Sequence, residues 1–229
     1  MKTKNKILIA LTVLPLIITA VVLKFMPERI PAHYDAAGNI DRWGSKYESF
    51  VLPGIIILMT LFWFGIIKYY ENKQKKSTDE KVVEESSNNA KVLYYVADSM
   101  AVMFGVMQCF FLYSAYTASV KAAETSIIDI NIITCVCMGL MFIVIGNILP
   151  KAKLNSLLGV RTVWSMHNDQ TWAVSNRFGG LLLVGCGILT IVSALIVGGK
   201  MSIFVMLGLL VVCTIIITVY TYFAYKRYK

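Results

Sequence analysis

Six long runs of apolar residues constrain the fold of this chain more than any other feature of its 229 residues. They occupy residues 7–25, 50–70, 93–117, 127–149, 178–198 and 201–225. About 20 consecutive apolar residues are enough for a helix to cross a bilayer. Because backbone N–H and C=O groups in lipid must be bonded within their own segment, each run is expected to be helical. The sequence therefore predicts an all-α integral membrane protein with six transmembrane helices.

Composition supports this prediction. Hydrophobic residues make up 57% of the chain and charged residues only 15%, where a soluble domain carries about a quarter charged residues. All five cysteines lie inside apolar runs without C-x-x-C spacing, so they are expected to be packing residues rather than disulfides or metal ligands. The net charge of +9 flanks the runs. Membrane orientation explains it better than binding to nucleic acid, and no cofactor is expected.

The distribution of lysine and arginine predicts which side each loop faces. An even number of spans places both termini on one side, and basic residues favour the cytoplasm. Of the 22 basic residues, all lie in the terminal segments or near the loops after spans two and four, except Lys24, Arg29, Arg42, Lys46, Lys121 and Lys200. Both termini are therefore predicted to be cytoplasmic. The first run, which lacks a small-residue cleavage site, is expected to be a retained span rather than a signal peptide.

The segment 71–91 divides the chain. It is rich in Lys, Glu, Ser and Asn, a composition that cannot support a packed core. We expect a flexible cytoplasmic linker between an N-terminal two-span unit, residues 1–70, and a C-terminal four-span unit, residues 92–229.

The predicted extracellular loop, residues 26–49, is more than a connector. Pro27 and Pro31 favour an extended exit from the membrane, and the stretch from Asp35 to Gly38 fits a turn. A small hairpin-like cap is expected here, and an external ligand is a plausible partner because loops on rigid scaffolds carry binding residues. A metal site or a catalytic role at His33 is the weaker interpretation, since no Cys or second His lies nearby.

The predicted cytoplasmic loop, residues 150–177, holds two tryptophans and two arginines. A helix that begins near Asn168 would place Trp172, Asn176 and Gly179 along one face. The following Gly180 would let another helix approach closely. We expect a short interfacial helix that leads into the fifth span. By composition alone, an amphipathic loop with tryptophan anchors is the competing interpretation.

Both loops resemble a known family. The predicted cytoplasmic loop is similar to the signature of the SdpI bacteriocin-immunity family at Asn155, Gly159, Arg161, Thr162, Trp164, Trp172, Asn176, Arg177, Gly179 and Gly180. The predicted extracellular loop resembles a small membrane domain that often precedes that family, at Pro27, Ile30, Pro31, His33, Gly38, Asp41, Trp43 and Lys46. Two positions depart from the family pattern: Val163 replaces a proline, and Asn176 replaces a histidine and so removes a titratable group.

The resemblance implies a six-span plasma-membrane protein of Gram-positive bacteria. It implies protection of the cell from a secreted peptide toxin, recognised outside, and signalling through a cytoplasmic autorepressor protein held at the membrane.

Polar residues within span three suggest an alternative. Asp98 and Gln108 fall on one helical face with Ala101 and Gly105, and an ionisable residue inside a membrane is a candidate functional residue unless it lies at headgroup level. A small transporter or exporter is the competing function. An enzyme is disfavoured because His33 and His167 are predicted on opposite sides, and neither H-E-x-x-H nor G-x-S-x-G occurs.

Overall fold

The structure is a computed structural model that describes residues 2–35, 37–121, 129–155 and 157–229. Its long helices are α1 (Lys2–Val22), α2 (Val51–Lys76), α3 (Glu80–Lys121), α4 (Ile130–Ile148), α5 (Asp169–Val197) and α6 (Gly199–Tyr228). Within the described residues, six helical segments are long and apolar enough to cross a membrane. The predicted helical membrane fold with six spans is confirmed, with a small sheet added to it.

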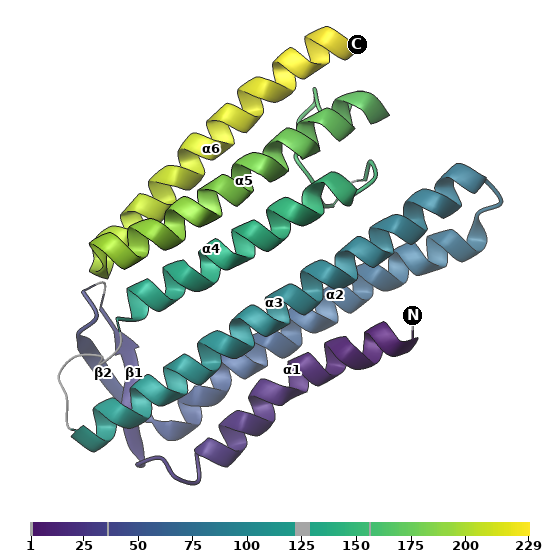
Figure 1. The fold of residues 1–229 in the computed structure, drawn as a ribbon. Coiled ribbons are helices and arrows are strands. Elements are labelled where there is room, and N and C mark those ends of the chain that lie inside the picture. The colour runs from purple at the N-terminus through teal and green to yellow at the C-terminus, as the bar shows by residue number, and fades with distance from the viewer. Residues whose placement is uncertain (1, 36, 122–128, 156) are drawn as a thin grey trace.

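The helices pack in two groups of three (Figure 1). The first core joins α1, α2 and α3 through Leu8, Ile67, Tyr70, Ala90, Leu93, Tyr94, Ala97 and Ala101. The second joins α4, α5 and α6 through Cys135, Phe142, Cys186, Ala194, Met206 and Cys213. The third helix therefore packs with the two before it, whereas the division of the sequence at 71–91 would place it with the three after it.

Glycines bring α4 and α5 into backbone contact. A Cβ atom at Gly180 would lie 2.4 Å from the carbonyl oxygen of Gly146, and one at Gly187 would lie 2.4 Å from that of Gly139. The two contacts are seven residues apart on each helix, so they lie on one face of each. Lipid is as apolar as the side chains, and close packing rather than water exclusion therefore holds such helices together. The close approach predicted at Gly180 is present.

The segment 71–91 is not the expected flexible linker. Helix α2 continues to Lys76 and α3 begins at Glu80, so only residues 77–79 connect them. The polar helix ends pack on each other and on α1. Tyr94 Oη donates to Glu71 Oε1 at 3.1 Å and also to Asn5, and Ser86 and Asn89 are buried. The composition argument fails here because Lys and Glu are good helix formers and packing against neighbouring helices supplies the rest.

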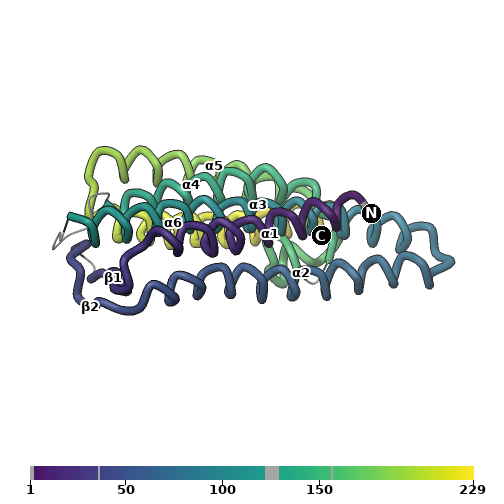
Figure 2. The backbone as a smooth tube through the Cα atoms, turned by 90° about the horizontal axis from the view of Figure 1, so that it is seen from below, coloured from purple at the N-terminus to yellow at the C-terminus, as the bar shows by residue number. Residues whose placement is uncertain are grey.

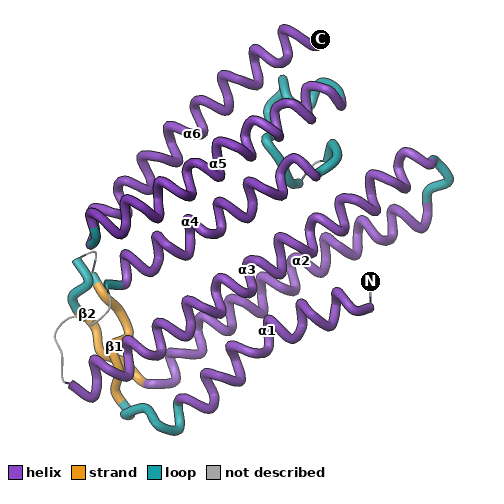
Figure 3. Tube along the Cα trace, in the orientation of Figure 1, coloured by secondary structure: helices purple, strands orange, loops and turns teal. Residues whose placement is uncertain are grey.

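A β-hairpin and a long loop occupy opposite ends of the bundle (Figure 3). The hairpin cap, residues 29–50, consists of β1 (Arg29–Tyr34), β2 (Ile40–Ser45) and the 3₁₀ turn η1 (Lys46–Phe50). The signature loop, residues 149–168, begins with the 3₁₀ turn η2 (Leu149–Lys151) and ends at α5. Both chain ends lie at the signature-loop end (Figure 2). The side of the membrane that each end faces stays a prediction from the basic residues.

Candidate functional site

The hairpin cap confirms the hairpin predicted for residues 26–49. Strands β1 and β2 pair antiparallel with Pro31 opposite Trp43, and the register is irregular around His33. At the turn, Asp35 Oδ1 accepts hydrogen bonds from the backbone N–H groups of Ala37 and Asn39 at 2.8 and 2.9 Å. The side-chain amide of Asn39 also donates to Asp35 and lowers the pKa of that carboxyl below its usual value. Gly38 adopts a φ of +87°, which suits a residue without a side chain.

Two ion pairs and a contact between a histidine and a carboxylate hold the hairpin cap together. His33 Nδ1 lies 2.7 Å from Asp41, Lys46 Nζ 2.8 Å from Glu28, and Arg42 Nη2 2.7 Å from Glu48. The sequence singled out His33, Asp41 and Lys46 but not their neighbours Arg42 and Glu48. A signal for Glu48 was present: Ser45 and Glu48 form a capping box at the start of η1, the Ser-x-x-Glu pattern typical of helix starts.

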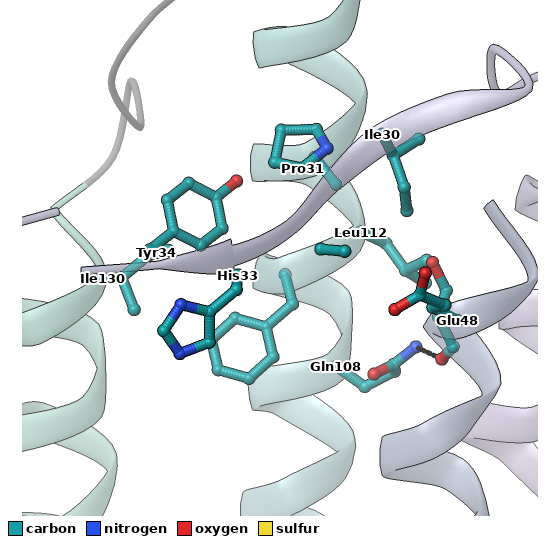
Figure 4. A pocket seen from close by; sticks show the side chains of 12 residues that line it. Ile30, Pro31, His33, Tyr34, Glu48, Gln108, Leu112 and Ile130 are labelled. Atoms are coloured by element: carbon teal, nitrogen blue, oxygen red, sulfur yellow. Dashed lines mark hydrogen bonds between the residues drawn. The ribbon is translucent and has the colours of Figure 1, made fainter. Parts of the chain in front are cut away.

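A cavity of about 290 Å³ lies between the hairpin cap and α3 (Figure 4). His33, Tyr34 and Ile30 line it from β1, Glu48 from η1, and Leu112 from α3. Burial raises the pKa of the Tyr34 phenol, which therefore stays neutral at physiological pH. The cavity combines an apolar wall with polar groups on the side of the hairpin. This combination is typical of small ligand sites.

Gln108 lines the same cavity and ties it to the helices. Only 2% of its surface is exposed, and its Nε2 atom donates to Thr19 Oγ1 and to the carbonyl oxygen of Ser49, both at 2.9 Å. One amide thus joins α1, α3 and the base of the hairpin cap. The sequence predicts that Gln108 lies on an intramembrane face of its helix. It does not predict the partners Thr19 and Ser49, because they are distant in sequence.

Asp98 lies elsewhere, against a second cavity of about 330 Å³ between α3 and α4. The other lining residues include Val102, Cys137, Leu140 and Val144. The buried Oδ1 atom of Asp98 accepts no hydrogen bond within the described part of the chain. Ten residues of helix separate Asp98 from Gln108, about 15 Å along the axis, so the structure does not bring the two predicted intramembrane residues together.

The signature loop is fastened by Trp172 and Asn176 on the first two turns of α5. The indole Nε1 of Trp172 donates to the carbonyl oxygen of Ala152 at 2.8 Å. Asn176 Oδ1 accepts from the backbone N–H of Val160 at 2.7 Å, and its Nδ2 donates to the carbonyl oxygen of Trp172 at 3.0 Å. Both side chains are buried, at 2% and 1% exposure. These two predicted residues therefore anchor the backbone of the signature loop to α5.

Other signature residues shape the loop. Asn155 Oδ1 accepts from the N–H groups of Leu157 and Leu158. Gly159 has a φ of +135°, and a Cβ there would lie 2.5 Å from the Trp172 ring. A Cβ at Gly179 would meet Val160 at 2.5 Å. Asn155 therefore shapes the turn of the loop, and the two glycines leave room where the loop packs against α5.

The signature loop also contacts α6. Thr162 Oγ1 lies within hydrogen-bond distance of Thr221 Oγ1 at 3.0 Å, and the ring of Trp164 packs edge-on against Tyr222 with centroids 5.3 Å apart. Arg161, Arg177 and Val163 remain exposed, Val163 at 83%. Because nothing packs on Val163, the departure from the family's proline costs the loop no side-chain contact.

The helix predicted from about Asn168 is present, but it is not a separate interfacial helix. Asn168 caps α5, which runs unbroken from Asp169 to Val197. Asn168 Oδ1 accepts from the Thr171 N–H at 2.8 Å, and Thr171 Oγ1 accepts from the Asn168 N–H at 3.1 Å. This reciprocal cap satisfies backbone groups at the helix start. The predicted interfacial helix and the fifth span are therefore one continuous helix that begins at this cap.

The start of α3 reaches the same loop. Lys81 Nζ lies 2.8 Å from Asp169, and Asn88 Nδ2 donates to the carbonyl oxygen of Lys151 at 2.6 Å. At the opposite end of the bundle, Asp129 caps α4 and also accepts a hydrogen bond from the Gly199 N–H at the start of α6, at 2.7 Å. The sequence alone does not predict these contacts, because each joins residues more than 60 positions apart.

The fold and these two regions define a class: a six-helix membrane protein with a β-hairpin cap at one end and an ordered signature loop at the other. No group of three or more His, Cys, Asp or Glu side chains is placed to hold a metal ion within the described ranges.

Two segments of the chain match known protein families. Residues 10–57 match a domain of unknown function, DUF1648, and residues 151–221 match the SdpI/YfhL protein family. The predicted resemblance is confirmed: the N-terminal segment is similar to DUF1648 and the later segment is similar to the SdpI/YfhL family. The first match contains the whole hairpin cap, and the second contains most of the signature loop.

One curated relative extends the likeness to nearly the whole chain. The immunity protein SdpI of Bacillus subtilis strain 168 is 23% identical over 224 residues, which cover 98% of this chain and 97% of the relative. No solved structure matches this chain significantly.

Proposed function

We propose that this protein is a membrane immunity protein that protects the cell from a secreted peptide toxin. The supporting observation is the likeness to the Bacillus subtilis immunity protein, which extends over almost all of both chains. The proposed orientation, with the hairpin cap outside and the signature loop and both termini inside, is supported by the distribution of basic residues.

In this proposal the cavity beneath the hairpin cap receives part of the toxin. Its apolar wall suits a hydrophobic side chain, while His33, Tyr34 and Glu48 offer polar partners. Gln108 would connect a toxin bound in this cavity to the helices, because its amide donates to Thr19 of α1 and to the carbonyl oxygen of Ser49.

We further propose that the exposed face of the signature loop binds a cytoplasmic autorepressor. Arg161 and Trp164 are its candidate contacts. Arg161 is exposed and Trp164 is half-buried, and arginine and tryptophan are the residue types enriched at energetically dominant positions of protein interfaces.

A transport function requires a polar path through the bundle. Asp98 and Gln108 were its candidate residues, but they line separate cavities, and this separation favours immunity. Asp98→Asn should then leave protection unchanged. Loss of protection in this variant would instead support a transport mechanism.

The proposal is tested by expressing the protein in a strain sensitive to related peptide toxins. Wild type should raise survival, whereas Gln108→Ala should abolish the gain at an equal membrane level of protein. Arg161→Ala together with Trp164→Ala should keep protection and lose toxin-dependent recruitment of a repressor to the membrane. Absence of any survival gain for wild type would refute the immunity function, and unchanged recruitment would refute the role of the loop.

A further inference from the structure

A groove of about 620 Å³ runs across α4, α5 and α6 beside the signature loop. Gly146 and Gly180, whose backbones touch, line it together with Pro150. One part of its wall is aromatic: Phe178 of α5 stacks on Tyr220 of α6, with ring centroids 3.9 Å apart and planes inclined by 12°. The groove is therefore built by helix packing and not by a single side chain.

The wall of this groove includes one cation. Arg177 lines it, is exposed, and makes no hydrogen bond or ion pair with any described residue. Asn147 of α4 also lines the groove and adds a polar group to its wall; its Nδ2 atom donates to the carbonyl oxygen of Ile143 at 2.8 Å. An unpaired guanidinium has five N–H donors and matches phosphate geometry better than any other side chain.

Apolar residues continue from Arg177 into the bundle. Leu181 and Val184 follow at i+4 and i+7, on the same face of α5, and both line the groove. Leu181 is 72% exposed. Helix α5 is one of the helices long and apolar enough to cross a membrane. We infer from this that Leu181 and Val184 face hydrocarbon and that Arg177, one turn nearer the start of the helix, lies closer to the headgroups.

We propose that this groove binds an anionic phospholipid of the adjacent leaflet. Arg177 contacts the phosphate, Asn147 contacts the headgroup, and one acyl chain lies along Leu181 and Val184. Along one face of α5 the cation is followed by an apolar wall, and this order complements an amphipathic anion. A free phosphate would contact only the cation and not the apolar wall. This proposal is independent of toxin immunity.

The test measures lipid retained by the purified protein in detergent, by native mass spectrometry, with equal amounts of phosphatidylglycerol and phosphatidylcholine. Wild type should retain phosphatidylglycerol preferentially. Arg177→Gln should lower its occupancy about fivefold, the effect of one basic residue at an anionic membrane surface. Arg177→Lys, which keeps the charge, should retain most of the preference and shows that the fold tolerates a change there.

Lys68→Gln is the matched control, because Lys68 is an exposed cation of α2 outside this groove. It should leave the preference unchanged. Equal loss in both glutamine variants, or no loss in Arg177→Gln, would overturn the proposal. Inorganic phosphate at millimolar concentration should not displace the lipid; displacement would show that the groove recognises the anion alone and not the phospholipid.

Discussion

The hairpin cap and the signature loop both depend on polar contacts, but the contacts differ in kind. Within the hairpin cap the contacts are mainly exposed ion pairs such as Arg42 with Glu48, which solvent screening keeps weak, while at its base the buried amide of Gln108 bonds to the Ser49 carbonyl oxygen. The signature loop is fastened by buried side chains, chiefly Trp172 and Asn176, that bond to its backbone. Losing one partner of a buried bond costs more than losing an exposed pair. The difference indicates an adaptable end and a rigid end of one bundle.

The strongest way to break this comparison is to remove Trp172. Trp172→Ala should lower the free energy of unfolding in detergent by about 3–5 kcal/mol, because it opens a cavity in a packed site and frees the carbonyl of Ala152. Thermal unfolding followed by circular dichroism measures this. Trp43→Ala in the hairpin cap is the control, since Trp43 is 37% exposed. Equal destabilisation by the two changes would show that the ends do not differ.

The glycine contact beside the signature loop should be nearly as sensitive. Gly180→Ala places a methyl group 2.4 Å from the Gly146 carbonyl oxygen, so α4 and α5 must separate, at a cost of about 1–3 kcal/mol. Gly185→Ala on the same helix meets no atom within 4 Å and should be neutral or slightly stabilising. The two variants are compared by their unfolding temperatures, and a similar fall in both would place the effect in the helix backbone rather than in the contact.

Asn176 tests the polar side of the comparison. Asn176→Ala leaves the partly buried Val160 N–H without its acceptor, which should cost about 1–3 kcal/mol. Asn176→His, the residue usual in the family, keeps one ring nitrogen as acceptor and should cost less. Hydrogen exchange at the Val160 amide reports the bond directly. Unchanged protection in Asn176→Ala would show that this bond does not hold the loop.

The smallest effect is expected in the hairpin cap. Arg42→Ala and Glu48→Ala should each lower the free energy of unfolding by less than Asn176→Ala does, because solvent screens an exposed ion pair, and their double-mutant coupling should shrink as salt is raised. Unfolding in low and high salt measures this coupling. A coupling that exceeds the loss caused by Asn176→Ala would reverse the proposed order of rigidity.

Much of the fold was predictable because its signals are local. Six apolar runs predict six helices, since lipid leaves the backbone no other partner. Asp35 and Gly38 predict the hairpin turn because turn chemistry depends on four residues. The helix start near Asn168 follows the same logic. Each of these features is confirmed at the expected place.

The arrangement of these elements was decided only by tertiary structure. Lipid-facing and helix-facing positions are both apolar, so the sequence does not reveal that α3 packs with α1 and α2. Nor does it reveal that Gln108 reaches Thr19 and Ser49 while Asp98 lines another cavity. Helix propensity and turn chemistry act over a few residues, whereas these contacts join segments tens of residues apart. The chain by itself determined its helices and its turn, and the packing of those helices determined which polar side chains share a site.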